Sequence, residues 1–241
     1  MTNTPAVLYV IGIGPGDPEL LTLKAARIIK EVPCICVPKG REEGSSLALG
    51  IVSKVIDLTG KEIIETHFPM KKTKSAEHFE DLDTKWHEIA QTIVRRLDKG
   101  RDIAFITLGD PSIYSTFFYL YDKLFELKPA IKIAIIPGVS SINASAAAAG
   151  ISLGLADEKI AILPSTYTDN LEGVLREFET VVLMKVNKTL DGIIQTLLKL
   201  DLLEKATYIS RLGMEGEVIT RDIKRIKKED LNYFSILIVK K

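Results

Sequence analysis

The stretch Ile103-Ala-Phe-Ile-Thr-Leu-Gly-Asp-Pro-Ser-Ile-Tyr-Ser-Thr116 contains a strand, a turn and the approach to a helix. Its first four residues form the apolar run that is typical of a strand buried on both faces. Gly109-Asp110-Pro111 ends that run, and apolar residues then return at helical spacing from Tyr114 onward. This order places Asp110 at the carboxyl edge of a sheet, where open α/β folds bind ligands.

Two roles fit Asp110 at this position. Its carboxylate could accept hydrogen bonds from hydroxyl or amino groups of a ligand, which Gly109 would allow to approach the backbone. Alternatively, Asp110-Pro111-Ser112 turns the chain and caps the helix that follows. The segment alone leaves both roles open.

The rest of the first half repeats the order of strand and helix. The pattern predicts strands at 7–13, 34–37, 62–68 and 103–106, with helices at 21–32, 47–56 and 79–97. Asp17 is the expected N-cap of the first helix, with Pro18 as its first residue. Alternating strands and helices predict an α/β domain with a mostly parallel sheet covered on both faces.

The second half begins the same way but then loses its helices. Strands are expected at 131–136, 160–163, 181–184, 218–219 and 235–239 and around Tyr208, and helices at 141–149, 190–200 and, weakly, 227–231. The scarcity of helices between the last strands predicts a mixed or antiparallel edge. We place a domain boundary between 117 and 129, which gives an N-terminal α/β domain, 1–118, and a C-terminal α/β domain with a mixed sheet, 119–241.

The composition restricts the classes of function. Thirty-two basic residues balance thirty-two acidic residues in 241, so no overall charge attracts the chain to nucleic acid or to an anionic membrane. The least polar long stretch, 142–156, is too short and too polar to span a bilayer. No basic segment followed by an apolar one marks the N-terminus for secretion, so we expect a cytoplasmic protein without nucleic-acid or membrane partners.

The residue types that bind metals are few and scattered. We expect Cys34 and Cys36 to point to opposite faces of one strand, which indicates neither a disulfide framework nor a zinc site. His78 and His87 are nine residues apart and fall on opposite faces of the long helix, and His67 stands apart from both. We therefore expect no metal bound by the protein itself.

The cluster Gly12-Ile-Gly-Pro-Gly-Asp-Pro18 is not a dinucleotide-binding fingerprint. Position 17, where that fingerprint has its third glycine, is Asp, and Pro15 has no N–H to offer a pyrophosphate. The acidic residue expected at the end of the second strand is also absent, because that strand ends Val37-Pro-Lys39. A turn beside a ligand and a helix-initiating turn both remain open.

Three motifs in this order and spacing resemble the tetrapyrrole (corrin/porphyrin) methylase family: 12–22 (GIGPGDPELLT), 108–115 (LGDPSIYS) and 137–141 (PGVSS). The ordered set, with the strand end Leu183-Met184, spans nearly the whole chain. The resemblance implies two α/β domains with the active-site trough between them, S-adenosylmethionine as methyl donor, a tetrapyrrole substrate and a homodimer. Phe68-Pro-Met70, Pro38-Lys39 and the run 108–117 resemble the branch that methylates C20 of precorrin-2 or of its cobalt form, cobalt-factor II, in cobalamin biosynthesis.

The resemblance also implies a set of cofactor-binding residues. They are Pro15, Leu108, Gly109, Asp110, Ile113, Ser140, Ser141, Met184 and, by looser matches, Gly213 and Ser235. Family members that act on uroporphyrinogen III have an acidic residue where this chain has Pro38, so any catalytic role of that acid does not transfer.

The substrate of this branch carries many carboxylates, so cations near the strand ends are candidates for holding it. The expected substrate-binding residues are Lys39, Pro69, Met70 and Tyr114, and further cations to consider are Arg41, Lys71, Lys72 and Lys185. Tyr114 and His67 are conceivable bases, but no catalytic residue is assigned. Three alternatives stay open: methylation at another ring position, methylation of a different target, and a ligand-binding module without turnover.

Overall fold

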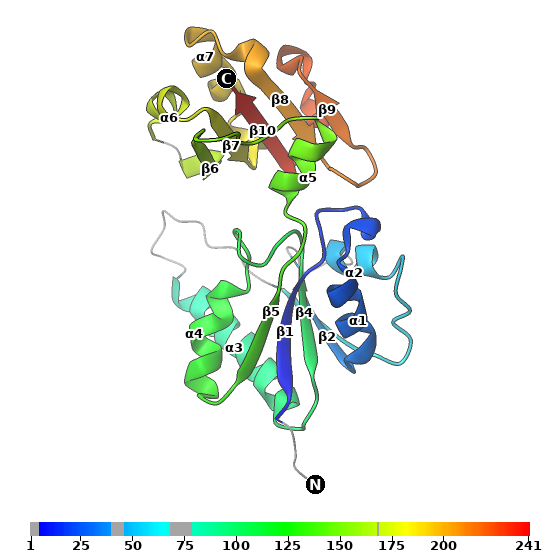
Figure 1. Cartoon of the computed structure of the whole chain (residues 1–241). Helices are drawn as coiled ribbons and strands as arrows, with labels where there is room; N and C mark the ends of the chain where they lie inside the picture. The colour runs from blue at the N-terminus through cyan, green and yellow to red at the C-terminus, as the bar shows by residue number, and fades with distance from the viewer. Residues whose placement is uncertain (1–4, 40–45, 68–78, 168) are drawn as a thin grey trace. The chain divides into compact units, whose positions relative to one another are not determined.

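The computed structural model describes residues 5–39, 46–67, 79–167 and 169–241. The chain forms two compact units, Met1–Ser140 and Ser141–Lys241. Each unit contains one five-stranded sheet (Figure 1).

The sheet of the first unit is parallel throughout. Its strands are β1 (Val7–Gly12), β2 (Cys34–Lys39), β3 (Glu62–His67), β4 (Ile103–Thr107) and β5 (Lys132–Ile136), in the order β3-β2-β4-β1-β5. Gly12 pairs with Thr107 at the carboxyl ends of β1 and β4. The loops that follow these two central strands therefore leave the sheet side by side.

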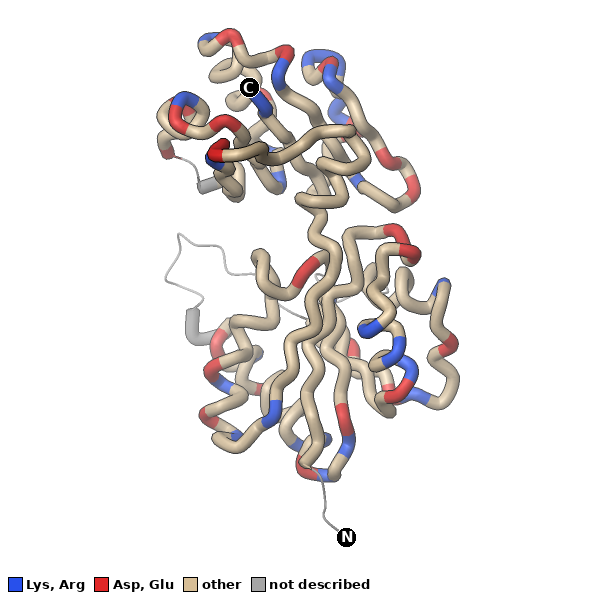
Figure 2. The backbone as a smooth tube through the Cα atoms, viewed as in Figure 1, with Lys and Arg blue, Asp and Glu red and all other residues tan. Residues whose placement is uncertain are grey.

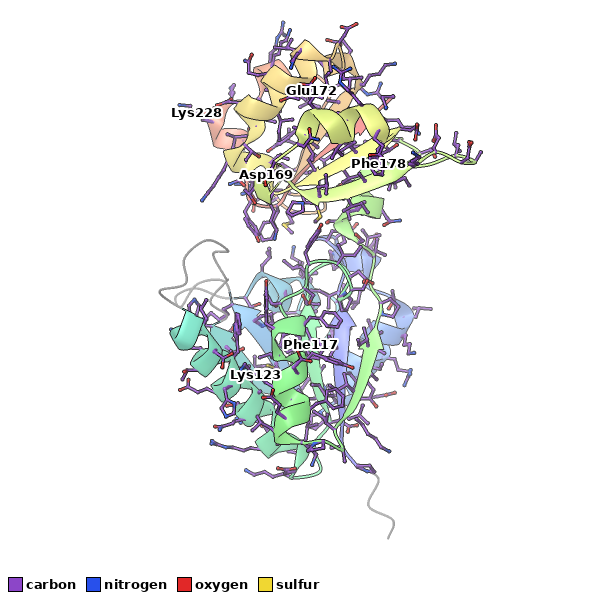
Figure 3. All side chains as sticks on the ribbon, turned by 90° about the vertical axis from the view of Figure 1, so that its left-hand side faces the viewer. Phe117, Lys123, Asp169, Glu172, Phe178 and Lys228 are labelled. Atoms are coloured by element: carbon purple, nitrogen blue, oxygen red, sulfur yellow. The ribbon has the colours of Figure 1, made fainter. Side chains whose placement is uncertain are left out.

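Helices cover both faces of this sheet, as the sequence predicts. On one face lie α1 (Leu23–Glu31) and α2 (Leu47–Val52), and on the other lie α3 (Phe79–Leu97) and α4 (Phe118–Leu127) (Figure 1). Alternate residues of β4 enter the two cores: Ile106 packs on the α1 side and Phe105 on the α3 side. The ring of Phe117, labelled in Figure 3, is fully buried with its centroid 5.4 Å from that of Phe105.

The sheet of the second unit is mixed. Its strands are β6 (Ile160–Pro164), β7 (Thr180–Met184), β8 (Ala206–Ser210), β9 (Val218–Thr220) and β10 (Ser235–Lys240), in the order β6-β7-β10-β8-β9. Only β6 and β7 run parallel, whereas β10 is antiparallel to β7 and to β8, and β9 to β8. The ends of β7 and β8 and the start of β10 therefore share one edge.

Three helices pack on this second sheet. Helices α6 (Leu171–Glu177) and α7 (Leu190–Lys199) enclose a core with the buried residues of one face, and α5 (Ser141–Ala148) contacts β10. The remaining connections include the 3-10 turns Pro18–Leu20, Ser165–Tyr167, Val186–Lys188, Leu203–Lys205, Ile223–Arg225 and Lys228–Asp230.

The boundary between the two units lies between residues 140 and 141, whereas we expect it between 118 and 119 from the sequence. The difference arises because β5 pairs in parallel with β1, and therefore α4 and β5 complete the first sheet. The apolar strand pattern at 131–136 is compatible with either sheet, because the sequence of a strand does not by itself indicate which strand it pairs with.

Cys34 and Cys36 share a face of β2, contrary to our expectation. Residues two apart in a strand lie on the same face, and both thiols pack in the core on the α3 side. Burial raises the pKa of Cys34 to about 11 and that of Cys36 to about 12. Both therefore behave as small apolar core residues.

Along the described backbone of each unit, positions of basic residues are interspersed with positions of acidic residues (Figure 2). Ion pairs such as Lys123–Asp83, at 2.6 Å, hold neighbouring helices together. Within the described ranges, no helix has the length and apolar character needed to cross a bilayer.

Candidate functional site

Three loops meet at the carboxyl edge of the first sheet. The N–H of Gly109 donates to the carbonyl of Gly14 at 2.8 Å, and the N–H of Gly14 donates back to the carbonyl of Gly109 at 3.3 Å. Both glycines have positive φ, 83° for Gly14 and 68° for Gly109, which a residue with a side chain seldom adopts. The loop after β1 is thus bonded to the loop after β4.

The third loop, after β5, packs against the same glycines. A Cβ atom added at Gly12 would lie 2.5 Å from the carbonyl oxygen of Gly109 and 2.7 Å from the nitrogen of Gly138. A Cβ atom added at Gly138 would lie 2.7 Å from the carbonyl carbon of Gly12. Because these neighbours are backbone atoms, only glycine permits this approach, and the residues 12, 109 and 138 form a glycine contact between the three loops.

The carboxylate of Asp110 links two of these loops. Its Oδ1 accepts hydrogen bonds from the main-chain N–H of Ser112, at 2.8 Å, and from the Ser112 hydroxyl, while Oδ2 accepts from the N–H of Gly138 at 2.9 Å. Partial burial opposes ionisation of this carboxyl, but the hydrogen bonds from Ser112 and Gly138 outweigh it and hold the pKa below its ordinary value. Of the two roles considered for Asp110, the structure shows the turn-forming one.

The predicted cofactor residues of the first unit lie in these loops. Pro15 is buried next to Gly14, Leu108 and Ile113 are half-buried, and Ser140 is buried at the end of the loop after β5. Ser141 is the first residue of α5 and belongs to the second unit. The motifs at 12–22, 108–115 and 137–141 therefore converge although they are far apart in the sequence.

Among the predicted substrate residues, Tyr114 and Lys39 have contrasting surroundings. Tyr114 is 47% exposed and has a left-handed backbone, with φ of 51°. Lys39, at the end of β2, is ion-paired with Glu65 at 2.9 Å and only 15% of its side chain is exposed. The predictions for Arg41, Pro69, Met70, Lys71, Lys72 and His78 fall outside the described residues.

The second unit has its own strand-end cluster. The N–H of Lys185, directly after β7, donates to the carbonyl of Ser235, and the N–H of Arg211, directly after β8, donates to the carbonyl of Phe234, each at 2.8 Å. Met184 pairs with Ile236 at this edge. The predicted cofactor residues Met184, Gly213 and Ser235 therefore lie around the start of β10.

One buried hydroxyl in this cluster lacks a hydrogen bond of regular geometry within the described residues. Ser235 is 3% exposed, and its hydroxyl lies beside that of Tyr208, which donates to the carbonyl of Asp230 at 3.0 Å. An unpaired buried hydroxyl costs free energy, so this atom is suited to a polar ligand at the edge. The N–H of Gly213, by contrast, already donates to Glu217 at 2.7 Å.

Sequence reasoning missed three residues of this edge, Arg211, Tyr233 and Phe234. The two aromatic side chains are 47% and 40% exposed, and Nζ of Lys185 lies 5.3 Å from the centre of the Tyr233 ring. Nothing in the local pattern separates these side chains from surface residues, because their positions follow from the pairing of β10 with β7 and β8.

The described part of the chain contains no cluster of three His, Cys, Asp or Glu side chains that could hold a metal ion. The geometry consists of backbone turns, glycine contacts and hydrogen-bonding groups at strand ends. Such an arrangement can orient a bound organic molecule and supply donors and acceptors to it.

The chain is similar in sequence to one protein family and to named members of it. Residues 7–225 match the family model described as Tetrapyrrole (Corrin/Porphyrin) Methylases. A Methanocaldococcus jannaschii protein named probable cobalt-precorrin-2 C(20)-methyltransferase is 35% identical, over 97% of this chain and 96% of that protein. The cobalt-precorrin-2 C(20)-methyltransferase of Salmonella typhimurium is 33% identical, over 97% and 96%.

Solved structures share the fold. The cobalt precorrin-4 methyltransferase CbiF matches with a TM-score of 0.75 and 18% identity, over 100% of this chain and 97% of that one. The uroporphyrin-III C-methyl transferase of Thermus thermophilus, solved with S-adenyl homocysteine, matches with a TM-score of 0.64 and 22% identity, over 98% of both chains.

Proposed function

Because the chain belongs to the tetrapyrrole (corrin/porphyrin) methylases, we propose that it transfers a methyl group from S-adenosylmethionine to C20 of precorrin-2 or of its cobalt-containing form, in cobalamin biosynthesis. The observation that carries this proposal is the identity of 35% and 33% to two proteins named for that reaction, over nearly the full length of all three chains. Matches of this length include both units and all three strand-end loops.

The two strand-end clusters contain groups suited to S-adenosylmethionine, which has a carboxylate, an amino group, ribose hydroxyls and an adenine. The buried hydroxyl of Ser235 supports this proposal, since it makes no hydrogen bond of regular geometry within the described residues and a polar ligand could bind it. We propose that the cofactor is held by Pro15, Leu108, Gly109, Asp110, Ile113, Ser140, Ser141, Met184, Gly213 and Ser235.

When bound, the cofactor supplies an electrophilic methyl group on a sulfonium. Transfer to the bridging carbon of the substrate would replace the C–S bond by a C–C bond and release the proton of that carbon, for which no accepting residue is assigned. The work left to this chain is positioning, which requires rigid loops. The glycine contact and the Asp110 hydrogen bonds provide that rigidity at the first sheet.

The proposed substrate contacts are Lys39, Pro69, Met70 and Tyr114. Tyr114 has the geometry best suited to the role, because its exposed ring follows the Asp110 turn directly. The charge of Lys39 is already balanced by Glu65, so it would hold a substrate carboxylate less strongly than an unpaired cation would.

The function is tested by incubating the protein with S-adenosylmethionine and with metal-free or cobalt-loaded precorrin-2, followed by mass spectrometry. We expect one methyl group to be added to at least one of the two substrates, and S-adenosylhomocysteine to compete with the methyl donor. Tight binding of donor and tetrapyrrole without any methylated product would favour a ligand-binding module instead.

We also propose that the protein is a cytoplasmic homodimer that binds no metal of its own and no nucleic acid or membrane. The balanced charge supports the last two points. The edge strand β6 has exposed Ile160 and Ile162, which a second copy would cover. Light scattering at micromolar concentration is expected to give twice the mass of the chain, and a monomer mass would contradict the dimer.

A further inference from the structure

Tyr208, in the middle of β8, is the largest of the fully buried side chains in the described residues. Its ring packs in the core that the second sheet forms with α6 and α7. Its hydroxyl donates to the main-chain carbonyl of Asp230 at 3.0 Å, and the hydroxyl of Ser210 donates to the same carbonyl at 3.4 Å. The ring alone accounts for the packing, whereas the hydroxyl holds a turn that lies 22 residues further along the chain.

Further hydrogen-bonding groups surround the phenol oxygen. The main-chain N–H of Asn232 and the hydroxyls of Ser210 and Ser235 lie beside it. Burial raises the pKa of Tyr208 above its ordinary value of 10.0, although these three groups oppose the change. The phenol therefore stays protonated at neutral pH and remains a hydrogen-bond donor. Three residues around this one oxygen, Asp230, Asn232 and Ser235, belong to the stretch that leads into β10.

Two anchors fix the segment 231–234, which joins Asp230 to the start of β10. The first is the bond from Tyr208 to the carbonyl of Asp230. The second is the N–H of Arg211, directly after β8, which donates to the carbonyl of Phe234 at 2.8 Å. The two aromatic side chains of the segment are 47% and 40% exposed, so packing of these rings holds it less firmly than the anchors do. The position of the segment therefore depends on the bond from Tyr208.

We propose that Tyr208 is a positioning residue for S-adenosylmethionine, which holds the stretch 230–235 through Asp230 so that Ser235 meets the cofactor. This inference rests on the proposed function, in which Ser235 is one of the cofactor residues, and extends it to a fully buried residue that acts through another. Without the hydroxyl, the stretch occupies the binding position for only part of the time, and the affinity falls in proportion to that fraction. All of these residues belong to the second unit.

Tyr208→Phe keeps the buried ring and removes only the hydroxyl. Because one hydrogen bond of ordinary strength is lost, the dissociation constant of S-adenosylhomocysteine, measured by calorimetry at 25 °C, is expected to rise about fivefold. The KM for S-adenosylmethionine should rise by a similar factor. The kcat at saturating methyl donor should stay within about twofold of wild type, because saturation selects the binding position.

Ser210→Ala is a second variant that leaves the Tyr208 ring and hydroxyl in place. It removes the longer bond to the carbonyl of Asp230, so the dissociation constant should rise about twofold. If Tyr208→Phe does not fold, Ser210→Ala decides alone, and an unchanged affinity in that variant overturns the proposal.

Glu158→Ala is the matched control for lost stability. Glu158 accepts hydrogen bonds from the N–H of Leu155 and from Lys240, which is the last residue of β10 and lies at the other end of that strand from Ser235. The control should therefore lower the melting temperature and leave the affinity for S-adenosylhomocysteine unchanged.

The outcomes separate this assignment from the proposed function. A wild type that binds S-adenosylhomocysteine and a Tyr208→Phe variant that binds it equally tightly overturn the assignment, because the hydroxyl would then serve only the fold. Equal weakening in Glu158→Ala overturns it as well, since lost stability alone would account for the effect. A wild type that binds no S-adenosylhomocysteine contradicts the proposed function itself, and this assignment with it.

Discussion

The Asp110 carboxylate is bound on both oxygens by the protein itself. Oδ1 accepts from Ser112 and Oδ2 accepts from Gly138, so the side chain joins the turn after β4 to the loop after β5. A role at the cofactor is compatible with these bonds, since each carboxylate oxygen accepts more than one hydrogen bond. Asp110 should therefore influence cofactor binding partly through the positions of its neighbours.

Asp110→Asn should lower the stability of the fold by removing the hydrogen bond from Gly138 while keeping the bonds from Ser112. Asparagine keeps an acceptor for Ser112, but its amide group cannot accept from Gly138, whose N–H then loses its partner. We expect the free energy of unfolding, measured in urea at neutral pH, to fall by about 1–2 kcal/mol, together with weaker binding of S-adenosylhomocysteine. Asp17→Asn is the control, because Asp17 only accepts from Glu19 in a turn where asparagine serves equally well.

The difference in stability between the wild type and Asp110→Asn should depend on pH. The folded pKa of Asp110 lies below its ordinary value of 3.8, so the ionised carboxylate contributes stability that is fully present above that value. This contribution is lost as the pH falls through the lower folded pKa. The stability difference between wild type and Asp110→Asn should therefore shrink in acid, and a difference that stays constant down to about pH 2 would contradict the account.

Gly138→Ala tests the glycine contact between the three loops. The added methyl group would meet the backbone of Gly12 and Gly109, which cannot rotate away, so we expect a loss of at least about 2 kcal/mol in the free energy of unfolding. Gly192→Ala in α7 is the matched control. No atom lies within 4 Å of its added Cβ, and a helical alanine should stabilise by about 0.5–1 kcal/mol. Equal effects of the two changes would show that the contact is not tight.

Among the helices and strands, the spacing of apolar residues predicted an element correctly where one helical or strand pattern continued without interruption. The prediction for 79–97 matches α3 at both ends, and the mixed second sheet is confirmed. Helix α6 was missed because its seven residues are too few for a periodic signal. Asp17 caps the 3-10 turn Pro18–Leu20, and α1 begins only at Leu23 after its own N-cap, Thr22.

Strand β2 gives a prediction about its thiols. Both cysteines are fully buried on one face, and burial raises the pKa of Cys34 to about 11 and of Cys36 to about 12. Since the thiolate is the reactive form, neither should react with a disulfide reagent at about pH 8 in the native protein, and both should react in urea. Rapid reaction of the folded protein would mean that β2 opens.

At the scale of the whole molecule, the sequence predicted the helices and strands better than it predicted which strands belong to which sheet. β5 has the apolar pattern of any buried strand, and only its pairing with β1 assigns it to the first unit. The site shows the same limit. The ordered motifs predicted loops that lie together at the first sheet, whereas Arg211 joins the second cluster only through the pairing of β8 with β10. The trough that the family resemblance implies between the two domains stays a prediction.

The position of the transferred methyl group on the macrocycle distinguishes this chain from other tetrapyrrole methylases, and isotope labelling locates it. Carbon-13-labelled methyl is supplied on S-adenosylmethionine together with precorrin-2 or its cobalt form, and the product is examined by NMR. We expect a single labelled methyl on the bridging carbon C20. A label on a pyrrole-ring carbon or on another bridging carbon would contradict the assignment, even though the chain would still be a tetrapyrrole methylase.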